Sequence, residues 1–380
     1  MRVLVYGLAR SGKAVSERLR ERGDEVVVVD ATLGNEDDLA LLDGVELVVK
    51  NPGVPGERPL VVEARERGIP VWSEIEFGWS LLPDARFVAV TGTNGKSTTV
   101  ELLGEIFRAA ERNVVVAGNI GRPLSAVRDA DWVVCEVSSF QLEDVHHFGS
   151  EVAVLLNVEP DHLDRHGTFD AYRDAKLRIF ERARVKIVPR GLGLDGIEFS
   201  GADDLPAEPS IRGAHNRENA AAATAAARAS GIDDEQIAAG LRSFPGVPHR
   251  LELVGERGGV RYVNDSKATN VAAALRGLAA YEGERVHLIL GGSPKGEDLA
   301  PLAAAIGPNV KSVHLIGAEA ERLGELIDGF RDDTLERAVA HAHDLAEPGD
   351  VILLSPACAS YDQFANFEER GEAFRALAQG

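Results

Sequence analysis

Short apolar runs alternate with longer segments of mixed polarity along most of the chain. The segments between the runs read as amphipathic helices, and two of them end at a glycine, Gly23 or Gly231. This alternation is typical of α/β proteins, in which crossover helices join parallel strands. The predicted strands lie at residues 3–6, 25–30, 46–50, 87–91, 114–117, 132–137, 152–158, 185–188, 260–263, 286–290, 312–316 and 351–354.

Two proline-containing stretches divide the alternation into three parts. Pro83-Asp84 separates the first part from the second, and residues 244–248, which contain two prolines and a glycine, separate the second from the third. A chain of 380 residues is long enough for two or three domains. We therefore predict three α/β domains in series, at residues 1–84, 85–245 and 246–380.

The first predicted strand runs into a loop, Gly7-Leu8-Ala9-Arg10-Ser11-Gly12, that opens a helix. Its spacing is that of a dinucleotide-binding fingerprint with alanine at the second glycine. Asp30 ends the next strand, where an acid that binds ribose would stand. The pattern predicts a Rossmann-like N-terminal domain. Taken alone it favours an NAD-linked oxidoreductase, and the alternative is a fold of this kind that has kept no ligand.

The second part contains the most informative motif, Thr91-Gly92-Thr93-Asn94-Gly95-Lys96-Ser97-Thr98, between a predicted strand and a predicted helix. In a phosphate-binding loop, backbone N–H groups and the helix N-terminus bind anionic oxygens. Lys96 would reach the β- and γ-phosphates, and the hydroxyl of Ser97 or Thr98 would bind Mg²⁺. Val90 stands where the strict pattern has its first glycine. We predict a P-loop ATPase-like central domain with a mostly parallel sheet.

Composition narrows the range of functions. Acidic residues outnumber basic ones by 61 to 41, and a net charge of −20 disfavours a nucleic-acid or anionic-membrane surface. Cys135 and Cys358 lack metal-ligand spacing, which suits a reducing compartment. The sequence has no signal-peptide pattern and no apolar run long enough to span a membrane. We therefore expect a cytoplasmic protein.

Polar side chains follow several predicted strands, at the sheet edge where open α/β sheets bind ligands. Glu136 is a candidate ligand for Mg²⁺, and the alternative is that it only caps the N-terminus of a helix. Residues 157–166 hold two histidines and three acids, a candidate metal cluster, although each histidine alone reads as a solvated or core residue. Lys176 reads from its helical context as solvated. Three further loops combine small residues with acids, hydroxyls or amines, at residues 264–270, 291–296 and 355–360.

Taken in order, these stretches resemble the motifs of the Mur ligase family of ATP-dependent amide ligases. The resemblance spans the whole chain and rests on residues 91–98, 136–141, 161–162, 213–219, 249–250, 264–270 and 355–367. It implies that the first domain binds a UDP group, which removes the oxidoreductase interpretation, and that the C-terminal domain is Rossmann-like. It also implies that ATP phosphorylates the carboxylate of UDP-N-acetylmuramoyl-L-alanine and that D-glutamate attacks the acyl phosphate. A monomer is expected.

The resemblance further implies a role for each motif. Ser97 and Glu136 would bind one Mg²⁺ ion, and His162 and a carbamylated Lys176 would bind a second, while Lys96 holds the phosphates. The implied ATP-binding residues are Gly92, Thr93, Asn94, Gly95, Lys96, Ser97, Thr98, His215, Asn216, Asn219, Arg250, Asp265 and Lys267. The implied UDP-substrate residues are Ser11, Asp30, Asn51, Pro52, Gly53, Asn119, Ser138 and Gln141. The implied D-glutamate residues are Thr269, Lys295, Ser360 and Phe367.

The chain departs from the family pattern in places, and other functions stay open. Asn51 stands where serine is usual, Ser293-Pro294 replaces an Asp-Gly pair of some members, and residues 186–213 look like a shortened edge of the central domain. One alternative is another Mur-type or folylpolyglutamate-type ligase with a different acceptor or amino acid. A nucleotide switch or UDP-sugar sensor would explain residues 91–98 and leave the three C-terminal loops unexplained.

Overall fold

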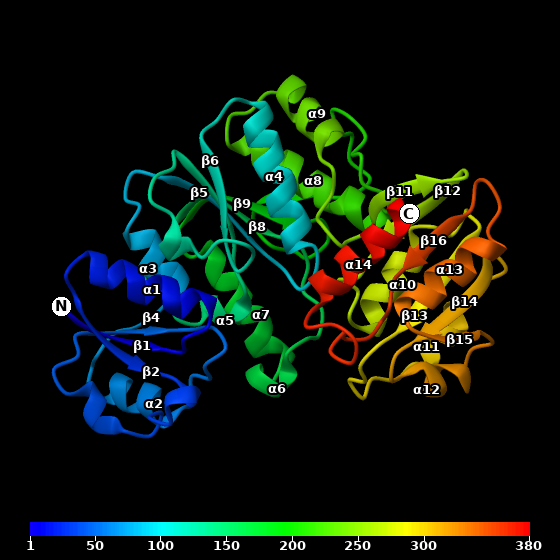
Figure 1. Cartoon of the computed structure of the whole chain (residues 1–380). Coiled ribbons are helices and arrows are strands. Elements are labelled where there is room, and N and C mark those ends of the chain that lie inside the picture. Colours follow the sequence, from blue (N-terminus) through cyan, green and yellow to red (C-terminus); the bar gives the residue numbers. More distant parts are fainter. The chain divides into compact units, whose positions relative to one another are not determined.

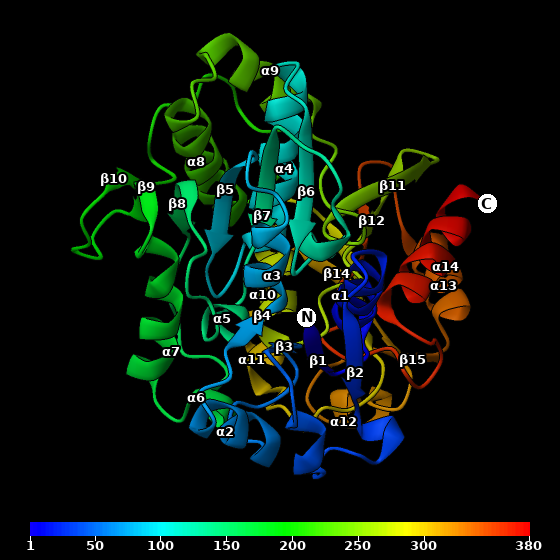
Figure 2. The same ribbon diagram turned by 90° about the vertical axis from the view of Figure 1, so that its left-hand side faces the viewer.

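The computed structural model describes residues 1–380, except for the side chain of Asp164, and its strands form three sheets (Figures 1 and 2). Almost all strand pairs are parallel, which confirms the predicted fold class. The chain divides into two compact units, residues 1–210 with 215–244, and residues 211–214 with 245–380. The first two sheets lie in the first unit and the third in the second. Domain boundaries at residues 84 and 245 stay a prediction.

The first sheet has four parallel strands in the order β2-β1-β3-β4. Its elements are β1 (Arg2–Tyr6), α1 (Arg10–Glu21), β2 (Glu25–Val29), η1 (Ala31–Leu33), η2 (Leu39–Leu42), β3 (Leu47–Lys50), α2 (Pro59–Glu66), β4 (Val71–Ser73) and α3 (Glu74–Ser80). Side chains of β1 and β3 alternate between two apolar clusters, because successive residues of a strand face opposite sides. Gly7 has φ +93°, and a Cβ at Gly12 would lie 1.8 Å from the Gly7 carbonyl oxygen, so the turn into α1 requires both glycines.

The second sheet has six parallel strands in the order β10-β9-β8-β5-β7-β6. Its strands are β5 (Arg86–Thr91), β6 (Val114–Gly118), β7 (Trp132–Glu136), β8 (Ser150–Leu155), β9 (Ala183–Pro189) and β10 (Ile197–Phe199). Its helices are α4 (Lys96–Ala109), η3 (Leu124–Ala126), α5 (Ser139–Leu142), α6 (Leu163–His166), α7 (Phe169–Leu177), η4 (Arg178–Phe180), α8 (Ala214–Ala229) and α9 (Asp234–Ser243). Since β7 and β8 flank β5, the segments that follow these three strands meet at one sheet edge.

Buried polar contacts join the first sheet to the second. Glu76 of α3 accepts hydrogen bonds from three consecutive backbone N–H groups, at residues 146–148, over 2.8–3.0 Å. Glu74 accepts from both the N–H and the hydroxyl of Ser125 at 2.7 Å. Lys50, which is 1% exposed, forms a 3.0 Å ion pair with Asp144. Because these groups are buried, loss of any partner would leave a costly unpaired polar atom.

The third sheet has six strands in the order β11-β12-β16-β13-β14-β15, and only β11 is antiparallel to its neighbour. Its strands are β11 (Glu252–Arg257), β12 (Val260–Asn264), β13 (Val286–Gly291), β14 (Val310–Ile316), β15 (Phe330–Asp333) and β16 (Val351–Leu354). Its helices are α10 (Val271–Ala279), α11 (Ala300–Ala305), α12 (Ala320–Gly324), α13 (Leu335–Leu345) and α14 (Phe367–Gln379). The first three helices pack on one face, and α13 and α14 pack on the other. Since β12, β16 and β13 are neighbours, the loops at 264–270, 355–360 and 291–296 leave the same edge.

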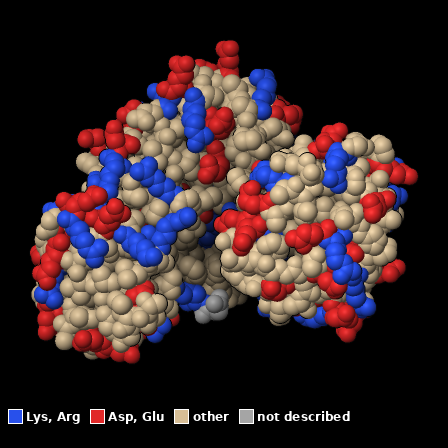
Figure 3. All heavy atoms as spheres, viewed as in Figure 1, with Lys and Arg blue, Asp and Glu red and all other residues tan. Residues whose placement is uncertain are grey.

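The distribution of charged side chains and the character of the helices agree with the charge and hydropathy of the sequence. Acidic and basic side chains are interspersed over the face drawn in Figure 3. None of the helices that the structure describes combines the length and the apolar character needed to cross a membrane.

Candidate active site

Residues 92–95 form a tight turn between β5 and α4. Gly95 has φ +84°, and a Cβ there would lie 2.2 Å from Oδ1 of Asn219, so this position requires glycine. Asn157 braces the turn, since its Oδ1 accepts from the Asn94 N–H at 2.9 Å and its Nδ2 donates to the Asn94 carbonyl at 3.2 Å. The turn is therefore held at the N-terminus of a 14-residue helix, an arrangement that binds phosphate.

Two lysines meet at this turn. Nζ of Lys96 donates to the carbonyl oxygens of Gly92 and Thr93, at 2.7 and 2.9 Å. Nζ of Lys176, from α7, donates to the same Gly92 oxygen at 2.8 Å, and its side chain is 2% exposed. Burial, and next the positive charge of Lys96, lower the pKa of Lys176 to about 7. A large share of Lys176 is therefore a neutral amine near neutral pH.

Oxygen atoms suited to a divalent cation lie beside the turn. The Ser97 hydroxyl donates to Glu136 Oε2 at 2.9 Å, and the amide of Asn119 donates to Oε1 at 2.9 Å. Glu136 is 3% exposed. The neighbouring Thr98 hydroxyl is buried without a hydrogen-bond partner among the described residues. A hydroxyl and a buried carboxylate are the ligands that Mg²⁺ prefers, so this part of the site fits the predicted ion.

His162 lies next to the same group, around the ring of Tyr172. The two rings have centroids 6.3 Å apart, and Nζ of Lys176 lies 4.6 Å from the centroid of Tyr172. The Tyr172 hydroxyl is 3.0 Å from Oγ1 of Thr93, which ties α7 to the phosphate-binding turn. His166, whose pKa is lowered chiefly by burial, lies 3.1 Å from the Ser139 hydroxyl. Of the two histidines, His162 is the more exposed and the better placed to bind a ligand.

At the end of β1, a cavity of about 210 Å³ is bordered by two predicted substrate residues, Asp30 and Gly53. Asp30 accepts hydrogen bonds from the hydroxyl and N–H of Thr32 and from the N–H of Leu8, and these bonds lower its pKa. The carboxylate is thus fixed in its ionised form at the mouth of the first glycine turn. This is the placement expected for an acid that accepts hydrogen bonds from ribose.

The loop at residues 51–54 is bonded to helix α6. The guanidinium of Arg165 donates to the carbonyls of Pro52 and Val54, each at 3.1 Å, and to Glu143 at 3.1 Å. Within the loop, Oδ1 of Asn51 accepts from the N–H of Gly53 at 3.0 Å. Since α6 begins directly after His162, Arg165 connects the predicted UDP loop with the predicted metal site.

Ser138 and Gln141 are engaged with each other. They form a capping box at the start of α5, in which each side chain accepts a hydrogen bond from the backbone N–H of the other residue. Their predicted contact with the muramoyl group stays a prediction. The same holds for Ser11, which lies 3.5 Å from the Asn51 amide nitrogen, and for Asn216, whose side chain accepts from Asn219. His215, which precedes Asn216 in α8, is half-buried.

In the second unit, Asp265 is a buried carboxyl at the end of β12. Its Oδ2 accepts from the Ser355 hydroxyl at 2.7 Å, and its Oδ1 accepts from the Leu251 N–H at 3.3 Å. Burial raises its pKa to about 7. Asp265 therefore links the segment that contains Arg250 to the loop after β16.

The predicted D-glutamate residues lie on loops that contact one another. Nζ of Lys295 donates to Oγ1 of Thr269 at 3.3 Å, and Nζ of Lys267 lies 5.7 Å from the ring centroid of Phe367. The N–H of Ser293 donates to the carbonyl of Ala359, next to the buried Ser360, at 2.8 Å. Lysines and hydroxyls on three joined loops are suited to bind a dicarboxylate.

Arg370, in α14, holds these loops together. Its guanidinium donates to the hydroxyl and carbonyl of Ser266 and to the carbonyls of Cys358 and Ala359, over 2.9–3.1 Å. The side chain is 1% exposed, and burial lowers its pKa to about 10. The sequence motifs did not identify Arg370, Arg165 or Tyr172 as site residues. A signal existed for Tyr172 alone, which precedes Lys176 by four residues and so shares its helix face.

Two segments match family models. Residues 90–191 match the Mur ligase middle domain, and residues 249–358 match the Mur ligase glutamate ligase domain. The chain is 42% identical to UDP-N-acetylmuramoylalanine–D-glutamate ligase of Anaeromyxobacter dehalogenans, over 99% of this chain and 97% of the relative. The same enzyme of Acidobacterium capsulatum is 39% identical, over 99% and 95%. The first alignment has 449 positions, so this 380-residue chain lacks segments that the relative contains.

Solved structures resemble the fold. UDP-N-acetylmuramate–alanine ligase MurC of Thermotoga maritima matches with a TM-score of 0.65 at 16% identity, over 100% of this chain and 99% of that one. The bifunctional folylpolyglutamate synthase/dihydrofolate synthase of Yersinia pestis, complexed with AMPPNP and manganese, matches with a TM-score of 0.61 at 20% identity, over 80% and 92%. At these identities the likeness concerns the fold.

Proposed function

Because this chain belongs to the Mur ligase family, we propose that it uses ATP to join D-glutamate to UDP-N-acetylmuramoyl-L-alanine, a step in peptidoglycan synthesis. The relatives of about 40% identity over nearly the whole chain carry the name of this reaction. The structural observation that carries the proposal is the buried amine of Lys176 on the carbonyl of Gly92, beside Lys96. A simple nucleotide switch has no need of a second buried lysine at its phosphate-binding turn.

The residues of the turn would position ATP for attack by the substrate carboxylate. The N–H groups at the start of α4 would bind the phosphates, and Lys96 would exchange its two carbonyl acceptors for phosphate oxygens. Mg²⁺ at Ser97 and Glu136, and a second ion at His162 and Lys176, would neutralise charge on the transferred phosphoryl group. A carboxylate oxygen of the substrate would then form a bond to the γ-phosphorus of ATP, while the bond between this phosphorus and the departing ADP oxygen breaks. The D-glutamate amine attacks the resulting acyl phosphate, phosphate leaves, and the amine loses a proton.

We infer that Lys176 acts as a carbamate. A neutral amine adds CO₂ by forming an N–C bond and releasing one proton, and a pKa of about 7 makes that amine available. The product is an anion, so it replaces the repulsion between Lys176 and Lys96 by an attraction and supplies oxygen ligands for a metal ion. Incubation with ¹³C-bicarbonate should give a carbamate resonance in the wild type that Lys176→Arg lacks.

Phosphate release from ATP tests the reaction directly. With Mg²⁺ and UDP-N-acetylmuramoyl-L-alanine present, we expect release with D-glutamate and background rates with L-glutamate or no amino acid. Release with L-glutamate and a pterin acceptor would instead support a folylpolyglutamate-type ligase, an enzyme that this chain resembles in fold. Release without any acceptor would indicate a simple ATPase. We further propose a cytoplasmic monomer, which light scattering after size exclusion tests for its oligomeric state.

A further inference from the structure

A row of hydrogen-bonded polar side chains crosses the face of the third sheet that α13 and α14 cover. His287 on β13 and His314 on β14 share that face with Ile289 and Ile316, since side chains two residues apart in a strand point the same way. His287 and His314 are 2% and 0% exposed. The row runs from Asp350 to His287 at 3.2 Å, to Ser312 at 2.7 Å, to His314 at 2.8 Å and to Asp332 at 2.7 Å.

This row has one hydrogen-bond contact more than it has protons. Each contact needs one proton, and two neutral imidazoles and one hydroxyl supply three for the four contacts. When His287 donates its single proton to Asp350, the Ser312 hydroxyl must donate to His287. His314 must then donate to Ser312. The Nδ1 lone pair of His314 then faces the Asp332 carboxylate at 2.7 Å. Two acceptors at that distance repel each other, so this contact requires a fourth proton or a metal ion between the two atoms.

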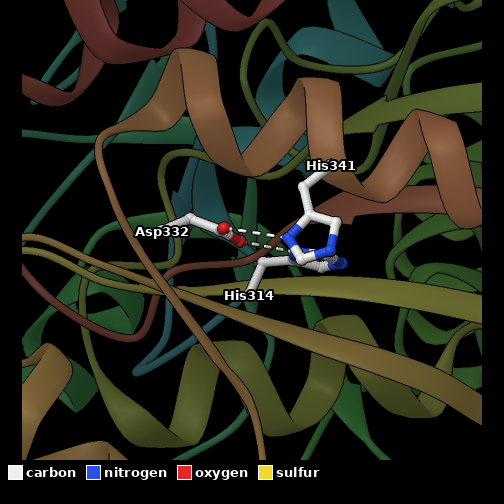
Figure 4. A group of neighbouring side chains, drawn as sticks. All are labelled: His314, Asp332 and His341. Carbon is white, nitrogen blue, oxygen red and sulfur yellow. Dashed lines mark hydrogen bonds and ion pairs between the residues drawn. The ribbon is translucent and has the colours of Figure 1, made fainter.

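Asp332 and His341 lie beside His314 at this end of the row. His314 pairs with Phe330 and Leu315 with Arg331 across the ladder, but Ile316 pairs with Asp333, so Asp332 is the extra residue of a bulge. Its second oxygen lies 2.9 Å from Nδ1 of His341. Figure 4 shows both imidazoles, one from β14 and one from α13, turned toward this carboxylate. The three ligand atoms lie within 4.8 Å of one another.

We propose that His314, Asp332 and His341 bind a Zn²⁺ ion, with water as its fourth ligand. Two imidazoles and a carboxylate form a ligand set of the kind that holds zinc in proteins. The hydrogen bond from His314 to Ser312, which in turn bonds to His287, would orient the imidazole, as the outer contacts of zinc-bound histidines do. With the metal bound, the three remaining contacts of the row have their three protons. His341, whose side chain is 35% exposed, gives the ion access from solvent.

The ion would fasten the edge strand β15 to β14 and α13. Its anchor Asp332 precedes Asp333, which has φ +63° and whose carbonyl accepts from Gly317 at 2.9 Å and from the amide of Gln363 at 2.6 Å. Gln363 belongs to the segment between Ser360 and Phe367. The ion would therefore support a loop predicted to bind the amino acid.

The test compares zinc binding by the full-length wild type and two variants of helix α13. His341→Ala removes a ligand, whereas the control His343→Ala removes a half-buried histidine two residues away whose Nδ1 lies 2.7 Å from the Tyr262 hydroxyl. After dialysis against Zn²⁺ and then buffer, we expect the wild type and the control to retain one more zinc ion per chain than His341→Ala. Co²⁺ should show tetrahedral absorption bands in the first two proteins alone.

Asp332→Asn provides a second variant if His341→Ala does not fold. It keeps the size and one acceptor of the side chain but removes the charge, and we expect the same loss of one zinc ion. Zinc content and Co²⁺ spectra that are identical in the wild type, His341→Ala and Asp332→Asn would overturn the proposal. In that case a proton shared along the row, and not a metal ion, would supply the missing positive charge.

Discussion

Lys96 and Lys176 donate hydrogen bonds to the same atom, the carbonyl oxygen of Gly92, at 2.7 and 2.8 Å. Two ammonium groups on one acceptor repel each other, and this repulsion adds to burial in lowering the pKa of Lys176. The phosphate-binding turn and α7 are thereby coupled through one backbone atom. Modification of Lys176 to an anion would remove the conflict, which gives the buried amine a physical reason to react.

Lys176→Arg should lower kcat/KM by at least about 100-fold while leaving the thermal unfolding transition in place, since a metal ligand is lost. Arginine keeps the positive charge but stays protonated and cannot form a carbamate. Lys186→Arg serves as the control, because Lys186 lies on β9 in the same domain and stacks on Phe180. Near-normal turnover of Lys176→Arg would refute the carbamate.

The pH dependence of reactivation should report the pKa of Lys176. Enzyme freed of CO₂ should regain activity, once dissolved CO₂ is restored at a fixed concentration, at a rate proportional to the neutral amine. The pKa is lowered to about 7, so this rate should rise about tenfold per unit below pH 7 and level off above it. An ordinary lysine would give a rate that still rises at pH 9. That outcome would show that Lys176 is not buried as described.

Arg165→Ala should raise the KM for the UDP-linked substrate about tenfold, with a smaller change in kcat. The variant loses two charge-assisted hydrogen bonds that hold the carbonyls of Pro52 and Val54, and such bonds contribute roughly 1.5–3 kcal/mol. Arg128→Ala is the matched control, since Arg128 forms an exposed ion pair with Glu21. Equal increases in the KM for ATP and for the UDP substrate would contradict a role specific to the 51–54 loop.

Apolar runs were sufficient to predict the main strands and the α/β class. The strands that escaped prediction include β4, β10 and β15, which have three or four residues and are too short to show a period. The phosphate-binding turn was predictable because its function requires particular residues at consecutive positions.

The contacts around the site were less predictable. Lys176 reads as solvated in sequence because its burial depends on Gly92, 84 residues away. Arg165 and Arg370 look like ordinary surface arginines, and five of their seven acceptors are backbone carbonyls, which leave no trace in residue type.

Arg370→Lys should raise the KM for D-glutamate about tenfold and leave the KM for the UDP substrate unchanged. Lysine has no planar fork, so it cannot reproduce the four hydrogen bonds to Ser266, Cys358 and Ala359. Arg375→Lys is the control on the same helix, since Arg375 pairs with Glu252 at a half-buried position. If both variants behave alike, Arg370 has no special part in holding the loops.

Glu74→Gln should remove a pH dependence of stability between about pH 4.5 and 6. Burial raises the pKa of Glu74 to about 6 from 4.5 in the unfolded chain, so the native state holds its proton over that interval. A raised carboxyl pKa contributes stability below pH 4.5 that is lost as the pH rises through 6, by about 2 kcal/mol for this shift.

Glutamine resembles the protonated acid and can still accept from Ser125, so its variant should lack this loss. Urea unfolding at pH 4.5, 6 and 8 measures the effect as the difference between the two proteins, which cancels the other titrating groups. As the pH rises from 4.5 to 8, the unfolding free energy of Glu74→Gln should increase relative to that of the wild type. A difference that stays constant with pH would mean that Glu74 is ionised in the native state, stabilised by its hydrogen bonds to Ser125.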